Sequence, residues 1–192
     1  MKRGKFYFIT GGARSGKSSF AEKLAVQLKK RVTYIATAEA LDGEMADRIR
    51  KHKERRPASW TTIEEPHRVT AVLEEVGQQE GVILIDCLTL LVTNLLFSST
   101  TSEQKDAQQK EQDLLSEIRR LAQEAQECQA DVIIVSNEVG LGLVPEYPDS
   151  RLFRDLTGWA NQIMAQEADH AYFLVSGMAL DIKQLQIDPE KL

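Results

Sequence analysis

The chain has 192 residues, of which 42% are hydrophobic and 28% are charged, and its formal net charge is −5. This length allows one sizeable core, so we expect a single domain spanning residues 1–192. The acidic balance and the lack of a basic run interleaved with aromatic residues argue against a nucleic-acid partner. No apolar stretch approaches the roughly 20 residues of a membrane span, and the N-terminus carries no cleavage pattern, so we expect a cytoplasmic protein.

Five short apolar runs are typical of strands that are covered on both faces of a parallel sheet. They span residues 6–10, 32–37, 82–88, 131–137 and 171–176. Helix-period segments separate them, which predicts an α/β fold with a mainly parallel sheet flanked by helices. Because such sheets bind ligands at the carboxyl ends of their strands, the residues just beyond each strand are the candidates for function.

The first of these strands leads into a phosphate-binding pattern, G-x-x-x-x-G-K-[ST]. Its residues are Gly11, Gly12, Ala13, Arg14, Ser15, Gly16, Lys17 and Ser18. Glycine lets the backbone approach phosphate oxygens, and successive N–H groups, with the dipole of a helix predicted over 18–30, hold an anion. Lys17 supplies a charge for the β- and γ-phosphates, and the hydroxyl of Ser18 reaches a bound Mg²⁺. The pattern therefore predicts a site for a nucleoside triphosphate.

A helix-period segment over 42–56 follows the second strand and carries His52 on the same face as Met45 and Ile49. The cations beside this histidine are Lys51, Lys53, Arg55 and Arg56. One interpretation is a solvated basic helix. The other is a nucleophilic imidazole whose neighbours neutralise triphosphate oxygens, because neutral imidazole is abundant at pH 7 and attacks an α-phosphate without a strong base. The residues alone leave both interpretations open.

The third predicted strand ends in hydrophobic residues followed by Asp86, the usual partner of a phosphate loop. Such an acid orients Mg²⁺ directly or through water. The next residue, Cys87, continues the apolar run. With Cys128 it gives neither metal spacing nor a disulfide framework. Because Cys87 lies in an apolar run, we expect it to be a buried, inert thiol. Beyond the fourth strand, the polar residues 136–138 stand where a ligand would lie.

Two helices are predicted in the second half of the chain, and both are expected to pack on the core. The first has an apolar stripe at Leu114, Ile118, Leu121, Ala125 and Cys128. The second spans 149–168 and places in register Leu152, Leu156, Trp159, Ile163 and Glu167. Residues 98–112 are almost free of large apolar side chains, which predicts either a mobile loop or a solvated helix start without function.

A phosphate loop alone is compatible with a kinase, a motor, a switch GTPase or a nucleotidyltransferase. The acidic balance disfavours a motor that moves on nucleic acid. Guanine switches usually carry an N-K-x-D motif, and the segment Asn137-Glu138-Val139-Gly140 lacks both the lysine and the aspartate. A simple small-molecule kinase stays open, but it leaves the cations around His52 unexplained. His67 and His170 have no neighbours that indicate chemistry, so we expect structural roles for both.

Motifs along nearly the whole chain resemble the bifunctional adenosylcobinamide kinase/adenosylcobinamide-phosphate guanylyltransferase family. The matching segments are Thr10–Ser18, Ile35–Ala38, Asp42–Glu64, Asp86–Thr89 with Thr93 and Asn94, Asn137–Pro145, Phe153–Gln162 and Ala168–Asp169. The third segment fits the pattern D-x-E-M-x-x-R-I-x-x-H-x-x-x-R-P-x-x-W-x-T-x-E. Because other phosphate-loop kinases lack these middle motifs, the resemblance is specific.

The resemblance implies a RecA-like P-loop NTPase fold, a homotrimer and two reactions of cobalamin biosynthesis. ATP or GTP phosphorylates the aminopropanol hydroxyl of adenosylcobinamide, and GTP then transfers GMP to that phosphate, which gives adenosylcobinamide-GDP and pyrophosphate. It implies a covalent guanylyl intermediate on His52 and a catalytic role for Lys17. It also implies that Ser18 and Asp86 hold Mg²⁺. The implied nucleotide contacts are Gly11, Gly12, Ala13, Arg14, Ser15, Gly16, Lys17, Ser18, Ala36, Thr37, Ala38, Lys53, Glu54, Arg55, Arg56, Glu64 and Asp86.

Overall fold

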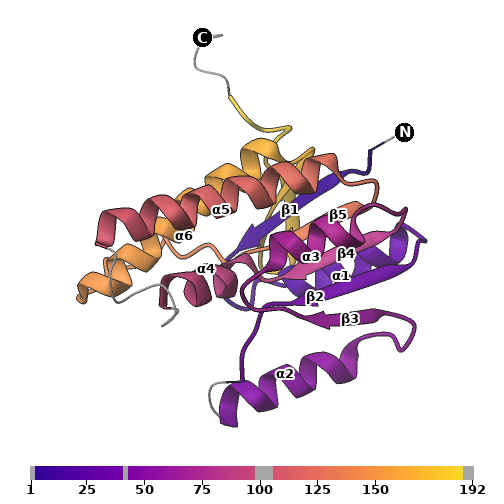
Figure 1. Cartoon of the computed structure of the whole chain (residues 1–192), viewed down its shortest axis with the longest axis horizontal. Helices are drawn as coiled ribbons and strands as arrows, with labels where there is room; N and C mark the ends of the chain where they lie inside the picture. Colours follow the sequence, from indigo (N-terminus) through magenta and orange to yellow (C-terminus); the bar gives the residue numbers. More distant parts are fainter. Residues whose placement is uncertain (1–2, 41–42, 98–105, 188–192) are drawn as a thin grey trace.

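The computed structural model describes residues 3–40, 43–97 and 106–187, which form a seven-stranded sheet with helices on both faces (Figure 1). The strand order is β3-β2-β4-β5-β1-β6-β7. The strands are β1 (Phe6–Gly11), β2 (Val32–Ala36), β3 (Thr61–Glu64), β4 (Val82–Asp86), β5 (Asp131–Val135), β6 (His170–Val175) and β7 (Met178–Asp181). Neighbouring strands are parallel except β6 and β7, which are antiparallel. The predicted α/β class and mainly parallel sheet are therefore confirmed.

Helices form a layer on each face of the sheet. They are α1 (Lys17–Gln27), α2 (Gly43–Arg55), α3 (Val69–Val76), α4 (Leu88–Phe97), α5 (Ala107–Glu127) and α6 (Pro148–Glu167). One face packs against α3, α4, α5 and α6, and the other packs against α1. Helix α2 lies apart from both layers, beyond the edge strand β3 (Figure 1). Within the described ranges, no helix combines the length and the apolar character that crossing a membrane requires.

Alternate residues of the central strands enter the two layers, which explains the continuous apolar runs in the sequence. On β4, Ile83 and Ile85 join the core under α3 to α6, whereas Val82 and Leu84 join the core under α1. All four side chains are at most 2% exposed. A central strand with both faces covered therefore has no polar face.

The five predicted strands are present, and all five begin and end within two residues of the prediction. The prediction over 82–88 is wrong at its end, because β4 stops at Asp86 and Leu88 begins α4. There the N–H of Cys87 donates to Oγ1 of Thr37 at 2.8 Å. The hydroxyl of Thr37 takes the place of a backbone acceptor on the neighbouring strand, so the chain leaves the sheet after Asp86.

Two edge strands and one helix had no clear pattern in the sequence. Strands β3 and β7 lie at the two edges of the sheet, and three of the four residues in each are exposed. Neither strand therefore has the apolar run that marks a central strand. Helix α4 is apolar on most sides, so its sequence shows no helical period and continues the run of β4.

The apolar stripe of α5 is confirmed as core packing, since all five of its residues are buried. The register predicted for α6 is wrong in part, because Trp159 is 41% exposed and Glu167 is also exposed. The buried residues of α6 are Leu156, Thr157, Ala160, Asn161 and Met164. Two of them are polar and hydrogen-bonded, which a search for apolar spacing does not detect.

The other local predictions had mixed outcomes. Helix α1 ends at Gln27, before the predicted end at residue 30. Residues 98–105 lie outside the described part of the chain, as does Asp42 at the start of the predicted helix 42–56. From Ala107 onward the segment 98–112 is helical, so the helix-start interpretation is confirmed there.

Both cysteine thiols are buried and free of disulfides. Burial is the largest cause that raises the pKa of Cys87 and of Cys128 to about 12. At neutral pH both therefore stay protonated, and the prediction that Cys87 is buried is confirmed.

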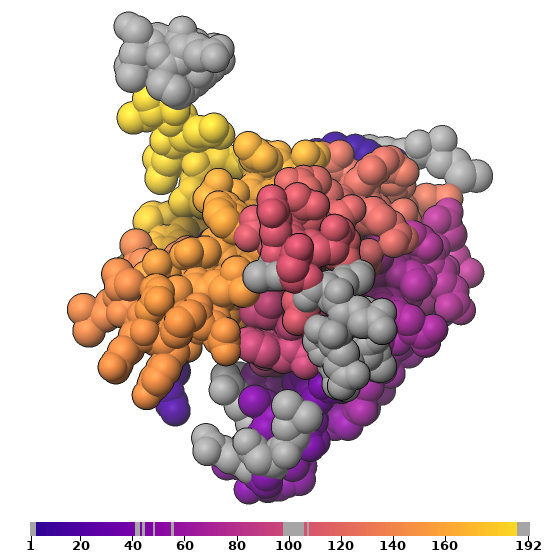
Figure 2. Space-filling model, turned by 60° about the vertical axis from the view of Figure 1, so that its left-hand side comes forward, coloured from indigo at the N-terminus to yellow at the C-terminus, as the bar shows by residue number. Residues whose placement is uncertain are grey.

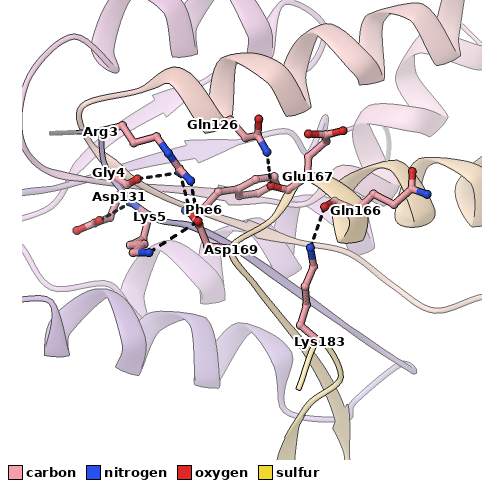
Figure 3. Close-up of polar contacts among 10 residues, drawn as sticks. All are labelled: Arg3, Gly4, Lys5, Phe6, Gln126, Asp131, Gln166, Glu167, Asp169 and Lys183. Carbon is pink, nitrogen blue, oxygen red and sulfur yellow. Dashed lines mark hydrogen bonds and ion pairs between the residues drawn. The ribbon is translucent and has the colours of Figure 1, made fainter. Parts of the chain in front are cut away.

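An ion pair at the amino-terminal end of the sheet joins the first strand to the start of β6 (Figure 3). Asp169 accepts two hydrogen bonds from the guanidinium of Arg3, each 2.8 Å long. Its Oδ2 also accepts the N–H of Phe6 at 2.9 Å, and its own N–H donates to the C=O of Phe6 at 2.9 Å. The hydrogen bonds from Arg3 are the largest cause that lowers the pKa of Asp169 to about 2.

Asp169→Asn is expected to lower the free energy of unfolding at neutral pH by about 1–2 kcal/mol, because it removes the charge that Arg3 contacts. The folded pKa of Asp169, about 2, is below the ordinary aspartate value of 3.8, so its ionisation stabilises the fold fully above that ordinary value. That contribution is lost as the pH falls toward 2. The difference between wild type and variant, measured by urea unfolding, therefore shrinks as the pH falls from about 5 to about 2.

Asp155→Asn is the control for this prediction, because Asp155 is an exposed aspartate whose partner is its neighbour Arg154. Its effect on the free energy of unfolding should stay within about 0.5 kcal/mol. Equal losses in the two variants would contradict the role of Asp169.

Candidate active site

The phosphate-loop pattern folds as a turn between β1 and α1. Gly11 has a φ of 152° and Gly16 a φ of 98°, backbone conformations that residues with a side chain rarely adopt. A Cβ on Gly11 would lie 2.4 Å from the C=O oxygen of Leu174 on β6. The N–H of Gly177, in the turn between β6 and β7, donates to the C=O of Ser15 at 2.9 Å. Strand β6 and the turn after it therefore hold the loop in shape.

Polar groups of the loop are arranged to receive an anion. Helix α1 begins without a side-chain cap and without an acidic residue in its first turn, so its N–H groups and dipole favour bound phosphate. Lys17 is almost fully buried and donates from Nζ to the C=O of Gly12 at 2.7 Å, which folds its ammonium over the loop. Oγ of Ser15 and Oγ1 of Thr10 are buried, and neither has a hydrogen-bond partner among the described residues.

The other predicted loop residues differ in exposure. Ala13 and Arg14 are exposed at the tip of the loop, and Arg14 has a left-handed φ of 57°. Ser18 is half-buried in the first turn of α1. The structure therefore gathers the predicted contacts from Gly11 to Ser18 in one turn around a helix N-terminus.

Asp86 ends β4, and β5 alone separates β4 from β1. Two strand spacings place its backbone on the order of 10 Å from β1. Its Oδ2 accepts the hydroxyl hydrogen of Tyr34 on β2 at 2.8 Å. Burial first, and then the charge of Asp86, raise the pKa of Tyr34, so its hydroxyl stays protonated and remains a donor.

Ser18 and Asp86 are the predicted ligands of Mg²⁺. The described residues contain no group of three or more acidic, histidine or cysteine side chains that would enclose a metal by themselves. Mg²⁺ does not need such a group, because it keeps several waters and is bound through one or two carboxylates together with substrate phosphates. One hydroxyl beside the phosphate loop and one carboxylate across β5 fit that chemistry.

The predicted contacts at 36–38 lie beside Asp86. The hydroxyl of Thr37 accepts the N–H of Cys87 at 2.8 Å and donates to the C=O of the same residue at 2.9 Å. The side-chain amide of Asn94, on α4, donates to the C=O of Thr37 at 2.8 Å. These bonds fix the segment after β2 against the end of β4.

His52 lies on the less exposed face of α2 with Met45 and Ile49, as the helical spacing predicts. Two predicted contacts near it, Lys53 and Glu64, form an ion pair between α2 and β3. Both of those side chains are about half exposed, at 47% and 58%. The pair therefore ties α2 to the edge of the sheet by a solvent-accessible contact.

The remaining predicted contacts of this helix lie differently. Glu54 is exposed, and its Oε1 accepts a hydrogen bond of 2.8 Å from Arg50, so it faces solvent. The side chain of Arg55 lies outside the described part of the structure. The carbon Cζ of Arg56 is 3.5 Å from the centroid of the Tyr34 ring, a cation–π contact.

A hollow of about 410 Å³ opens beside Arg56. Its lining residues are Lys53, Arg56, Pro57, Ala58, Trp60, Thr62 and Glu64. Nε and Nη1 of Arg56 are buried and have no hydrogen-bond partner among the described residues. Arg56 thus contributes to the wall of the hollow, and a guanidinium is a group suited to phosphate oxygens.

The structure does not bring His52 to the phosphate loop. Helix α2 lies beyond β3, whereas the loop follows β1, and β3 and β1 are four positions apart in the strand order (Figure 1). Four strand spacings amount to roughly 20 Å. The predicted site is therefore divided into a loop group around Lys17 and an edge group around His52 and Arg56, with Asp86 between them.

A buried polar network at the end of β5 is absent from the predicted site. The hydroxyl of Ser136 donates to Oδ1 of Asn161 at 2.6 Å and lies 3.2 Å from the hydroxyl of Thr89. Two residues further on, the N–H of Glu138 donates to the C=O of Gly11 at 2.9 Å. Ser136 and Glu138 are among the polar residues that the sequence places where a ligand would lie, and Thr89 and Asn161 lie in the family motifs. No local pattern predicts that the fold brings these groups together.

The two other histidines have structural contacts, as expected. Nε2 of His67 lies 3.4 Å from a carboxylate oxygen of Glu39. The ring of His170 stacks between those of Tyr7 and Tyr172, at centroid distances of 5.2 and 6.2 Å.

Together, the parallel sheet, the phosphate loop after β1 and the acid at the end of β4 define a P-loop nucleotide-binding protein of the RecA-like type. Solved structures share the fold. An ATPase from the type III secretion system of pathogenic bacteria aligns with a TM-score of 0.60 and 11% identity, over 98% of this chain and 60% of that chain. The P4 protein from bacteriophage phi6, solved with ADP, aligns with a TM-score of 0.50 and 14% identity, over 92% and 54%. Both solved chains are considerably longer than this one.

Sequence comparison narrows this class to one family. The model of cobinamide kinase/cobinamide phosphate guanyltransferase matches residues 7–182. The bifunctional adenosylcobalamin biosynthesis protein CobU of Escherichia coli is 42% identical over 178 residues, 91% of this chain and 98% of that protein. CobU of Salmonella typhimurium is 43% identical and CobP of Pseudomonas aeruginosa 42% identical, each over 91% of this chain and over 98% and 95% of those proteins.

The chain therefore belongs to this family, as its motifs indicated. It is a bifunctional enzyme of cobalamin biosynthesis, a cobinamide kinase and a cobinamide phosphate guanylyltransferase.

Gly11→Ala is expected to destabilise the fold by roughly 1–3 kcal/mol from backbone strain alone, with a further loss from the contact with Leu174. The matched control is Gly12→Ala, because a Cβ on Gly12 meets nothing within 4 Å. Urea unfolding of both variants measures the difference. Equal stability of the two proteins would show that the loop is not packed against β6 as described.

Proposed function

We propose that guanylyl transfer in this chain proceeds through a covalent GMP intermediate on His52, with the phosphate loop as the anchor of the triphosphate. One arrangement carries the proposal. The half-buried imidazole of His52 makes no hydrogen bond within the described part of the chain, and it lies four residues before Arg56. Arg56 lines the adjacent hollow and has two buried donors without a partner among the described residues. A nucleophile and a cation for the leaving group are thus on neighbouring turns.

In the kinase step, the aminopropanol hydroxyl oxygen of the cobinamide attacks the γ-phosphorus of ATP or GTP. The bond from that phosphorus to the bridging oxygen breaks, and the hydroxyl proton passes to solvent. Lys17 and the N–H groups of α1 stabilise the charge that develops on the phosphate oxygens. Ser18 and Asp86 would hold Mg²⁺, which supplies further neutralisation of the phosphates when bound.

In the guanylyl step, the unprotonated ring nitrogen of His52 attacks the α-phosphorus of GTP. The bond to the β-phosphate oxygen breaks and pyrophosphate leaves, with Lys53 and Arg56 neutralising its charge. A phosphate oxygen of the cobinamide phosphate then attacks the same phosphorus. The P–N bond breaks, His52 is regenerated, and the product carries a GDP group.

Transfer of GMP to His52 from GTP that is held in the phosphate loop requires α2 to approach the loop. Four strand spacings, roughly 20 Å, separate the strand beside α2 from the strand before the loop. Two contacts that hold α2 are the exposed Lys53–Glu64 ion pair and the Arg56–Tyr34 cation–π contact. An exposed ion pair of this type is worth about 1 kcal/mol or less. The cation–π contact is worth on the order of 2 kcal/mol, because the Tyr34 ring is only 2% exposed. Nucleotide phosphates that attract Lys53 and Arg56 therefore compete with them directly.

The homotrimer is also proposed, with its interface on two exposed apolar segments. The residues are Leu141, Leu143, Val144 and Tyr147 after β5, and Val175, Met178 and Leu180 in the β6–β7 hairpin, all between 47% and 95% exposed. Both segments, coloured orange and yellow, lie on the same side of the molecule (Figure 2). Large exposed apolar surface of this kind is typical of protein interfaces. A cytoplasmic location and the lack of a nucleic-acid partner stay predictions.

The decisive test of the nucleophile uses GTP labelled at the α-phosphate. The wild-type protein is expected to form an acid-labile, base-stable adduct, as for a P–N bond, and His52→Ala should abolish it. His67→Ala is the matched control, because His67 is also half exposed but pairs with Glu39. A normal adduct in His52→Ala would overturn the assignment.

Transfer of the γ-phosphate to adenosylcobinamide separates the two half-reactions. The variant His52→Ala should still transfer the γ-phosphate. The variant Lys17→Ala should lose both this transfer and the protein adduct from α-labelled GTP. A wild-type protein that phosphorylates adenosylcobinamide but is never α-labelled would be a simple kinase.

Light scattering tests the assembly. The wild-type protein should have three times the 21.6 kDa mass of one chain. The double variant Met178→Asp/Leu180→Asp should dissociate, because it buries two charges in the proposed interface. Val26→Asp, at a 53% exposed position on α1, is the control and should stay assembled. A wild-type mass equal to one chain would contradict the proposal.

A further inference from the structure

Tyr34 connects the two groups of the divided site. It is 2% exposed and is among the largest fully buried side chains of the described core. On β2 it pairs with Leu84 of β4, so that Asp86, two residues further along β4, lies on the same face of the sheet. Diagonal neighbours on adjacent strands lie within reach of a long side chain, and the Tyr34 hydroxyl donates to Oδ2 of Asp86 at 2.8 Å.

The ring of the same tyrosine carries a cation. Cζ of Arg56 lies 3.5 Å from the ring centroid, and Trp60 stacks on the Tyr34 ring with centroids 6.4 Å apart. Two guanidinium nitrogens of Arg56 stay without a partner within the described residues. The ring therefore seats the guanidinium while those two donors, Nε and Nη1, stay unpaired.

Asp86 and Arg56 carry opposite charges and both contact Tyr34, yet the described residues show no ion pair between them. A direct Arg–carboxylate pair would be bidentate and strong. Such a pair would occupy the Asp86 oxygen that a metal would bind and the Arg56 donors that phosphate would accept from. A neutral phenol that contacts both groups leaves each charge available.

We propose that Tyr34 is a positioning residue that orients Asp86 through its hydroxyl, seats Arg56 on its ring, and thereby keeps the two charges from neutralising each other. This inference rests on the proposed roles of Asp86 in Mg²⁺ binding and of Arg56 in phosphate binding. Tyr34 itself touches neither metal nor nucleotide. Its effect passes through its two partners.

The test is the Mg²⁺ dependence of GTP binding, measured by isothermal titration calorimetry without turnover. Tyr34→Phe removes the hydroxyl and keeps the ring. It should raise the Mg²⁺ concentration for half-maximal enhancement of GTP binding by about three- to tenfold, because a hydrogen bond to a carboxylate is lost. Its GTP affinity in EDTA should equal that of wild type, since the Arg56 contact is kept.

Two comparisons separate positioning from a general structural effect. Tyr34→Phe/Asp86→Asn should show the same Mg²⁺ dependence as Asp86→Asn alone, because Tyr34 acts through that carboxylate. The matched control is Tyr7→Phe, a tyrosine of β1 whose ring stacks on His170. It should bind as wild type does. Thermal melting of each variant checks that the fold is retained.

Tyr34→Leu tests the ring. Its GTP affinity in EDTA should fall as far as that of Arg56→Ala, and the double variant should fall no further. Should Tyr34→Leu lose its fold, the phenylalanine variant still decides the hydroxyl role, because phenylalanine fills the same volume.

The outcomes distinguish this inference from the proposed function. A wild-type protein whose GTP binding ignores Mg²⁺ would overturn the assigned metal role of Asp86 and this inference with it. If wild type responds to Mg²⁺ but Tyr34→Phe behaves like Tyr7→Phe, the positioning role alone is wrong. Additive losses in Tyr34→Phe/Asp86→Asn would also overturn it, since they would mean that Tyr34 acts independently of Asp86.

Discussion

The hydroxyl of Thr37 accepts the N–H of Cys87 and donates to its C=O, and much of the edge half of the site depends on these two buried bonds. They end the β2–β4 ladder and turn the chain into α4. The same bonds set the segment 36–38 against Asp86. Leaving two buried backbone groups unsatisfied costs about 1–3 kcal/mol each, so this point of the sheet tolerates little rearrangement. Asp86 and Tyr34 therefore lie on a rigid base, and α2 is attached beside it through the exposed Lys53–Glu64 ion pair and the contact of Arg56 with the Tyr34 ring.

This division has a chemical logic in a protein with two transfer reactions. The loop group is fixed in the sheet and offers N–H groups, a dipole and the ammonium of Lys17, which suit a triphosphate in either reaction. The edge group carries His52, the proposed nucleophile of guanylyl transfer alone. In this proposal the rigid part of the molecule holds what both reactions share, and helix α2 carries what distinguishes them.

The sequence predicted the fold and the site to the extent that their signals are local. The central strands have continuous apolar runs because both faces are buried, and the phosphate loop is contiguous, so both were recognisable. Strands β3 and β7 lie at exposed edges, so they lack the apolar run of a central strand. Helix α4 is apolar on most sides, so its sequence shows no helical periodicity. The bond from Tyr34 to Asp86 spans 52 residues and depends on the β2–β4 register, which no local pattern contains.

The contacts that surround the phosphate loop bear on how strongly it can bind. Backbone groups of the loop are already engaged in hydrogen bonds, namely the C=O groups of Gly11 and Gly12 and both the N–H and the C=O of Ser15. Fixing a free backbone residue costs roughly 1–2 kcal/mol of conformational entropy. In this loop that ordering is completed during folding, before any ligand arrives. Less of the interaction energy with phosphate is then spent on ordering, and more appears as affinity.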